Sequence, residues 1–145
     1  MDSLVEAVVV MGQPVRWVFL LGLAAGCAFA PEGAIPIEPP PRYRDWWAAT
    51  EVCSGRRGDF ARIEWAIVPG RGFACPTGTC VGRWEGDRIY LAEAFRDHEL
   101  VVRHEILHAL LDRPGHPDPP FGRGCPLTWS TWRAAGPSLE VPLID

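Results

Sequence analysis

The 145-residue chain contains no lysine and no asparagine, so its fourteen side chains of permanent positive charge are all arginines. We attribute these absences to GC-rich coding rather than to chemistry. Eighteen acidic residues leave a net charge of −4 at pH 7. A chain without a basic excess does not fit a nucleic-acid-binding protein, which needs positive charge to contact phosphates. We therefore expect no nucleic-acid partner.

The apolar run near the N-terminus is too short to span a bilayer comfortably: it covers 17–30, WVFLLGLAAGCAFA. Arg16 precedes it and small residues follow, which indicates a secretory signal. The segment LAAGC is similar to a bacterial lipobox, whose final cysteine receives a lipid and becomes the new N-terminus. We predict a lipoprotein signal peptide at 1–26 with lipidation at Cys27. The alternative is cleavage after Ala30.

A proline-rich stretch follows the signal. Residues 31–42, PEGAIPIEPPPR, show no periodicity, as expected of an extended, semi-stiff spacer. We predict a tether at 27–43 that holds a domain at 44–145 close to a membrane. The start codon stays open between Met1 and Met11. An exported domain of the bacterial cell envelope is expected, lipid-anchored and either periplasmic or on the outer surface.

The cysteine content agrees with export. Apart from Cys27 the chain has four cysteines, Cys53, Cys75, Cys80 and Cys125. An even number in a small exported domain predicts two disulfides. Three pairings are possible, and a local Cys75–Cys80 bridge around the turn P-T-G-T would leave Cys53 for Cys125. A zinc site made of the four thiolates is disfavoured because the chain has no CxxC pair.

Just under half of the residues are apolar and about a fifth are charged, which is typical of a globular domain. The pattern of apolar residues predicts helices at 45–54 and 98–112 and strands at 61–68 and 87–92. Asp45 and Asp97 can cap the helices, and Pro114-Gly115 ends the second. We expect Trp129 and Trp132 to fill the core.

The second predicted helix carries the sequence HEILH at 104–108. His104 and His108 lie one turn apart, so both imidazoles can reach one ion. Zinc binds imidazole nitrogen at about 2.0–2.1 Å in a tetrahedral arrangement, and such a pair supplies two corners. Glu105 points aside, where its carboxylate can accept a proton from water. The alternative is a solvated helix face that carries histidines without a metal.

This motif and its helix resemble those of the zincin metallopeptidases. The resemblance covers about twenty residues and implies an α+β fold, in which a short mixed or antiparallel sheet packs on the active-site helix. It also implies a Zn²⁺ cofactor, Glu105 as general base, and an edge strand that binds substrate in extended form. DRIYL at 87–91, just before the helix, is then the expected edge strand.

The third zinc ligand is predicted from the residues after the helix. The metzincin pattern does not fit, because Leu111 and Pro114 stand where it requires glycine and histidine. His116 is the only other histidine downstream, and Pro114-Gly115 could fold it back toward the first two. Asp118 is the fallback ligand. Asp112, one turn beyond His108, is expected to hold an imidazole N–H as an outer partner.

The leading functional hypothesis is zinc-dependent hydrolysis of peptide bonds in a peptide or protein substrate, by a monomer tethered to the membrane. Tyr90 is the candidate donor to the oxyanion. His98, at the start of the helix, is expected to be a surface or capping residue. Two alternatives remain open: a tethered binding or structural module with a closed zinc site, and a zinc amidase acting on cell-wall crosslinks.

Overall fold

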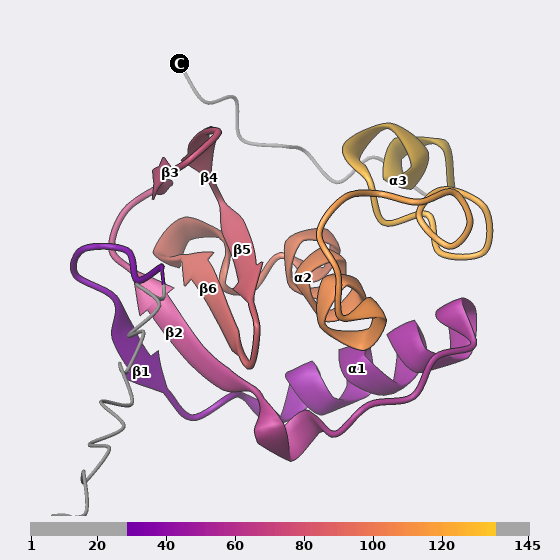
Figure 1. Ribbon diagram of the computed structural model, residues 1–145, viewed down its shortest axis with the longest axis horizontal. Coiled ribbons are helices and arrows are strands. Elements are labelled where there is room, and N and C mark those ends of the chain that lie inside the picture. The colour runs from indigo at the N-terminus through magenta and orange to yellow at the C-terminus, as the bar shows by residue number, and fades with distance from the viewer. Residues whose placement is uncertain (1–28, 136–145) are drawn as a thin grey trace, which may run out of the picture.

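The computed structural model describes residues 29–135. Its centre is a four-stranded mixed sheet with two long helices on one face (Figure 1). In spatial order the strands are β1 (Ile35–Ile37), β2 (Glu64–Val68), β6 (Arg88–Ala92) and β5 (Gly82–Glu85). The helices are α1 (Pro41–Ser54), α2 (Glu99–Leu111) and the short α3 (Trp129–Ala135). A separate hairpin joins β3 (Phe73–Cys75) to β4 (Gly78–Cys80). The small α+β fold predicted from the sequence is confirmed.

The position of β6 differs from the expectation. The predicted strands 61–68 and 87–92 correspond to β2 and β6, which pair in parallel. However, β6 is not the edge strand, because β5 pairs antiparallel along its outer side. Gly86, with a φ of 60°, turns the chain between them. The Gly86-Asp87 pair between RWE and RIY is a hairpin signal that the sequence interpretation missed.

Folded structure also begins earlier than residue 44. Residues 35–37 lie in the stretch assigned to the tether, yet they form β1 and pair antiparallel with β2. Helix α1 starts at Pro41 rather than after Asp45, because proline suits the first helical turn, where no backbone N–H partner is needed. Cys27 and the predicted signal peptide lie outside the described residues. Among residues 29–135, no helix is long and apolar enough to cross a membrane.

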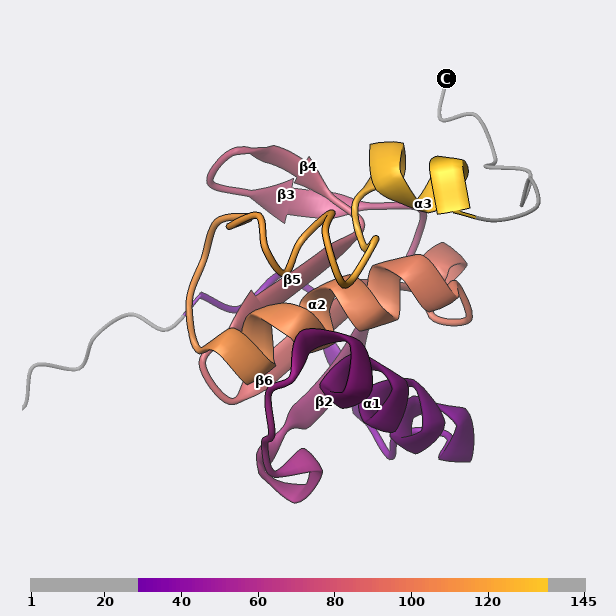
Figure 2. The same ribbon diagram turned by 90° about the vertical axis from the view of Figure 1, so that its right-hand side faces the viewer.

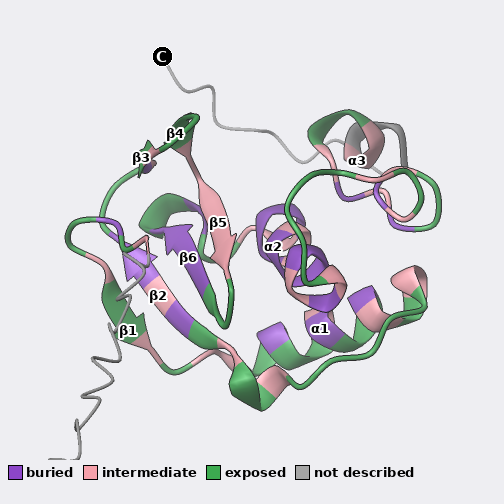
Figure 3. Ribbon diagram, in the orientation of Figure 1, coloured by how far each residue is buried: buried purple, intermediate pink, exposed green. Residues whose placement is uncertain are grey.

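Helix α2 is held from two sides. The main core lies between the sheet and the helices, and its fully buried members include Tyr43, Ile89, Leu91, Val102 and Ile106. A second, smaller cluster packs on the other side of α2 and contains Leu100, Leu107, Phe121, Cys125 and Leu127. Figure 3 shows the resulting burial along α2. Trp132 packs against the second cluster as predicted, whereas Trp129 stays 37% exposed.

The start of α2 is fixed by contacts between the helices. Asp97 does not cap α2, because its carboxylate forms an ion pair with Arg42 of α1. His98 occupies the cap position without a side-chain cap and packs against Phe95 and Trp129. Arg103 lies on an otherwise apolar arc of α2 because its Nε donates to Thr50 Oγ1 of α1, at 3.1 Å.

Two disulfides are present, as predicted. Cys75–Cys80 closes the β3–β4 hairpin, and Cys53–Cys125 ties the end of α1 to the segment before α3. The long bridge spans 72 residues of sequence. Closing a loop of that length stabilises a fold by about 4 kcal/mol in the chain-entropy account. The segment after α2 is therefore fixed to the body of the domain.

Candidate metal centre

Three histidines converge at the C-terminal half of α2. His104 and His108 project from successive turns of the helix, whose last residue, Leu111, is followed by Asp112 with a left-handed φ of 48°. Aspartate tolerates this conformation better than most residues. Pro114 and Gly115 then reverse the chain, and His116 folds back to place its Nε2 atom 3.0 Å from His104 Nε2. Figure 2 shows the segment after α2 running back along that helix. We call His104, His108 and His116 the histidine cluster.

Backbone carbonyls fix the orientation of two of these rings. His104 Nδ1 lies 2.6 Å from the Leu127 carbonyl oxygen, and His108 Nδ1 lies 3.0 Å from that of Arg113. A carbonyl can only accept, so each Nδ1 must carry the hydrogen. In the neutral rings Nε2 then keeps its lone pair, as a metal ligand requires.

The Nε2 atoms lie so close together that their lone pairs would repel each other unless a proton or a cation lay between them. His108 Nε2 and His104 Nε2 are 3.2 Å apart, and the candidate ligand atoms of all three residues lie within 4.8 Å of one another. A single proton can bridge only one such pair, whereas one cation can satisfy all three nitrogens. At Zn–N bonds of about 2.0–2.1 Å, two corners of a tetrahedron are about 3.3 Å apart. The cluster therefore fits a tetrahedral metal ion.

Burial favours the neutral form of His104 and His108. Burial, and then the neighbouring His104, lowers the pKa of His108 to about 4. Burial also lowers the pKa of His104, while its hydrogen bond to the Leu127 carbonyl acts in the opposite direction. Neutral imidazole is the form that binds metals, so neither ring has to lose a proton near neutral pH before it can act as a ligand.

Aromatic rings support the cluster. Phe121 is buried, and its centroid lies 5.1, 5.0 and 4.8 Å from those of His104, His108 and His116. Trp84 of β5 stacks on His108 with an interplanar angle of 13°. These contacts limit rotation of the imidazoles. No local sequence signal marks Phe121 or Trp84, because both reach the site through tertiary packing.

Glu105 lies between the cluster and β5. It is only 6% exposed, and burial raises the pKa of its carboxyl to about 8, against the lowering effects of the Trp84 backbone N–H and Arg83. Gly82 makes this placement possible, since a Cβ there would stand 2.7 Å from Glu105 Oε1. A cation bound next to this carboxyl would favour its ionised form, because opposite charge lowers a carboxyl pKa.

The other candidates lie elsewhere. Asp118 accepts hydrogen bonds from the backbone and side chain of Arg123 and is not part of the cluster. Asp112 lines a pocket between α1 and α2 near Arg57, so the outer partner of His108 is the Arg113 carbonyl and not this carboxylate. The structure does not place the Asp112 carboxylate beside His108, because this side chain lines that pocket while the chain from Arg113 to His116 returns to the cluster.

Tyr90 is also absent from the site. It pairs across the sheet with Arg83, while its neighbours Ile89 and Leu91 face the helices. Its hydroxyl donates to the Phe29 carbonyl, at 3.1 Å, on the opposite face of the sheet. Tyr90 therefore does not reach the main face of α2 and cannot serve as the oxyanion donor in this arrangement.

The histidine cluster opens into a cleft of about 530 Å³, which we call the main cleft. One wall is β5 from Gly82 to Glu85, another is the 114–116 turn, and Thr77 of the β3–β4 loop closes one end. Clefts of this size hold small molecules or short peptide segments. The arrangement can therefore present a metal ion and a buried carboxyl to a ligand.

Comparison of the chain with known protein families, curated proteins and solved structures finds no match. The chemistry of this site therefore has to be judged from its own residues.

Proposed function

We propose that the protein is a zinc-dependent hydrolase of peptide bonds. The observation that carries this proposal is the convergence of three Nε2 atoms beside a buried carboxyl, within an open cleft. Three protein nitrogens with a vacant fourth corner are typical of catalytic zinc sites. His104, His108 and His116 would hold the ion, which when bound acts as a Lewis acid and makes water more acidic.

The residues of the chain have distinct roles in this proposal. Glu105 accepts a proton from the attacking water and transfers it to the nitrogen of the departing amine. The Leu127 and Arg113 carbonyls keep the Nε2 atoms of His104 and His108 directed at one point. Among the described strands, β5 has only β6 as a partner, so its outer edge can pair with an extended peptide.

The test is metal analysis combined with peptide digestion. Purified protein should contain stoichiometric zinc, cleave a mixed peptide library, lose activity on chelation and regain it when zinc is restored. Mass spectrometry of the products identifies the broken bonds. Zinc-loaded protein that leaves every peptide intact would refute the proposal, and cleavage of cell-wall crosslinks alone would favour the amidase alternative.

A closed, non-catalytic zinc site is the competing class of function. It requires a fourth protein ligand, and Asp112 and Asp118 were the candidates. Within residues 29–135 neither carboxylate joins the histidine cluster, and the cluster lines the main cleft. Both observations support an open site.

We also propose that the domain is exported and lipid-anchored through Cys27. The two disulfides support export, because such bonds form in oxidising compartments. A Cys27→Ser variant should move from the membrane fraction to the soluble fraction, since a lipid modification is the expected anchor. Fractionation of cells followed by immunoblotting measures this. If the variant stays with the membrane as the parent does, Cys27 is not the point of attachment.

A further inference from the structure

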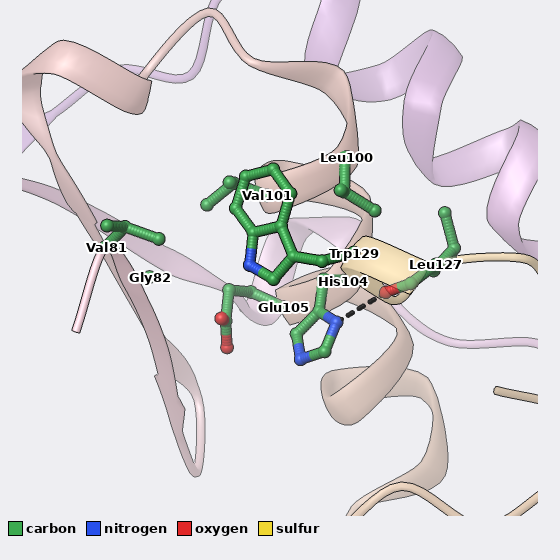
Figure 4. A pocket seen from close by; sticks show the side chains of 8 residues that line it. All are labelled: Val81, Gly82, Leu100, Val101, His104, Glu105, Leu127 and Trp129. Atoms are coloured by element: carbon green, nitrogen blue, oxygen red, sulfur yellow. Dashed lines mark hydrogen bonds between the residues drawn. The ribbon is translucent and has the colours of Figure 1, made fainter. Parts of the chain in front are cut away.

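The segment between α2 and α3, residues 113–128, reaches the histidine cluster at three places. It supplies His116, it places the Phe121 ring against the imidazoles, and its Leu127 carbonyl accepts a hydrogen bond from His104 Nδ1 at 2.6 Å (Figure 4). The whole segment lies within the described part of the chain and contains no helix or strand. Its position therefore depends on what ties it to the rest of the domain.

Cys125 is the residue at which these contacts meet. Its backbone carbonyl accepts two hydrogen bonds, from the N–H of Gly122 at 2.9 Å and from the N–H of Leu127 at 2.8 Å. Its own N–H donates to the Pro120 carbonyl at 3.0 Å, one residue before Phe121. Cys125 thus connects the Phe121 ring and the Leu127 carbonyl through its backbone, and a displacement of Cys125 would move both.

The side chain of Cys125 is fully buried and is bonded to Cys53, near the end of α1. Helix α1 is in turn tied to α2 at the turn that carries His104. Arg103, the residue before His104, donates from Nε to Thr50 Oγ1 of α1 at 3.1 Å. Its Nη2 also lies 3.7 Å from Cys53 Sγ. The disulfide therefore anchors the 113–128 segment beside the turn of α2 that carries the first proposed ligand.

The other disulfide has no such relation to the histidine cluster. Cys75–Cys80 closes the β3–β4 hairpin, which contributes Thr77 and Cys80 to the wall of the main cleft. The hydrogen bonds that orient the histidine rings come instead from the Leu127 and Arg113 carbonyls. The chain thus contains its own matched control, a second disulfide that lies near the cleft without orienting a proposed ligand.

We propose that the Cys53–Cys125 disulfide positions His104 for metal binding, so that the histidine cluster binds zinc tightly only when this bond is formed. Without the bond, the 113–128 segment loses its covalent attachment to α1. The hydrogen bond to His104 and the packing of Phe121 then weaken. Loss of an outer partner of a ligand costs about 10- to 100-fold in metal affinity, and we expect a loss of that size. The inference rests on metal binding in the proposed function and not on peptide hydrolysis.

The bond forms by oxidation of the two thiols of Cys53 and Cys125. Their two electrons and two protons pass to a disulfide-bonded oxidoreductase of an oxidising compartment, whose own disulfide is reduced to two thiols. In a reducing compartment the thiols of the protein persist, and the affinity for zinc stays low. Tight binding of zinc, and any activity that depends on it, is thereby confined to protein that has left the reducing compartment in which it was made.

The first experiment removes each disulfide in turn from the full-length protein. Competition with a coloured chelator measures the zinc affinity of the parent, of Cys53→Ala/Cys125→Ala and of Cys75→Ala/Cys80→Ala. Alanine leaves no thiol that could itself bind zinc. The first variant should bind zinc about 10- to 100-fold more weakly than the parent, whereas the second should keep the affinity of the parent. Unchanged zinc affinity in Cys53→Ala/Cys125→Ala overturns the proposal.

A second experiment keeps both disulfides and decides the question if Cys53→Ala/Cys125→Ala does not fold. Coupling between two sites is reciprocal, so bound zinc should protect the Cys53–Cys125 bond from reduction by the same factor. The parent and His116→Ala are equilibrated in glutathione buffers at a fixed concentration of free zinc. Alkylation and mass spectrometry then give the reduced fraction of each disulfide. Zinc should shift the Cys53–Cys125 equilibrium about 10- to 100-fold toward the disulfide in the parent alone, and leave Cys75–Cys80 unchanged.

The remaining results separate this inference from the proposed function. A Cys53–Cys125 equilibrium that does not respond to zinc overturns the inference, and so does an equal shift in His116→Ala. Equal protection of both disulfides would mean that zinc stabilises the fold as a whole, which also overturns it. A parent protein that binds zinc and shows the coupling but cleaves no peptide refutes the proposed hydrolysis and leaves the inference standing. A parent that binds no zinc overturns both.

Discussion

The Glu105→Gln variant should keep its zinc and lose peptide hydrolysis. Glutamine has nearly the same shape as glutamate but cannot accept the proton, and general-base catalysis contributes about 100- to 10,000-fold to a rate. The variant should fold, because a neutral amide has a lower burial cost than the carboxylate at this 6% exposed position. Peptide cleavage and zinc content, measured on the same preparation, separate loss of the base from loss of the metal.

Glu93→Gln is the matched control for this experiment. It makes the same chemical change at an exposed residue of the short 3₁₀ turn before α2, outside the main cleft. The Glu93→Gln variant should hydrolyse peptides as fast as the parent protein does. Full activity of Glu105→Gln would exclude Glu105 as the general base, and loss of zinc would show that its carboxylate acts as a ligand.

The His116→Ala variant should bind zinc more weakly by more than about 100-fold. Loss of an outer hydrogen-bond partner of a ligand already costs 10- to 100-fold in affinity, and loss of a direct ligand costs more. His116 is exposed, so its truncation leaves the core intact. Competition with a coloured chelator measures the affinity.

His98→Ala is the control, because it removes a histidine that lies outside the cluster. It should retain the zinc affinity of the parent. Unchanged affinity in His116→Ala would mean that the ion is held without residue 116, and the site would need another third ligand.

Local sequence signals were sufficient for α2 and the histidine cluster. Three signals lie within one short stretch of sequence: the spacing of the apolar residues, the HEILH motif and the helix-ending pair Pro114-Gly115. The helix and the chain reversal after it could therefore be predicted together. The approach of His116 to His104 follows from that reversal. The disulfide count followed from composition, and the structure then supplied the pairing.

The partners of the cluster could not be predicted in the same way. The Leu127 carbonyl and the Phe121 ring reach it through a loop without periodicity, fixed by a disulfide to α1. Tyr90 was the candidate oxyanion donor, yet one step of strand alternation puts it on the other face. Proximity in sequence does not tell which face of a strand meets a helix.

Phe29 lies on the face of the sheet away from the helices, where it packs against Tyr90 and beneath Arg83. Strands β1 and β5 form opposite margins of the sheet, three strand spacings or about 14 Å apart. Cys27, the proposed point of lipidation, precedes Phe29 by two residues in the sequence, so the chain would join that anchor to the domain on this face of the sheet. The helix-covered face, which carries the histidine cluster, lies on the opposite side of the sheet from that junction.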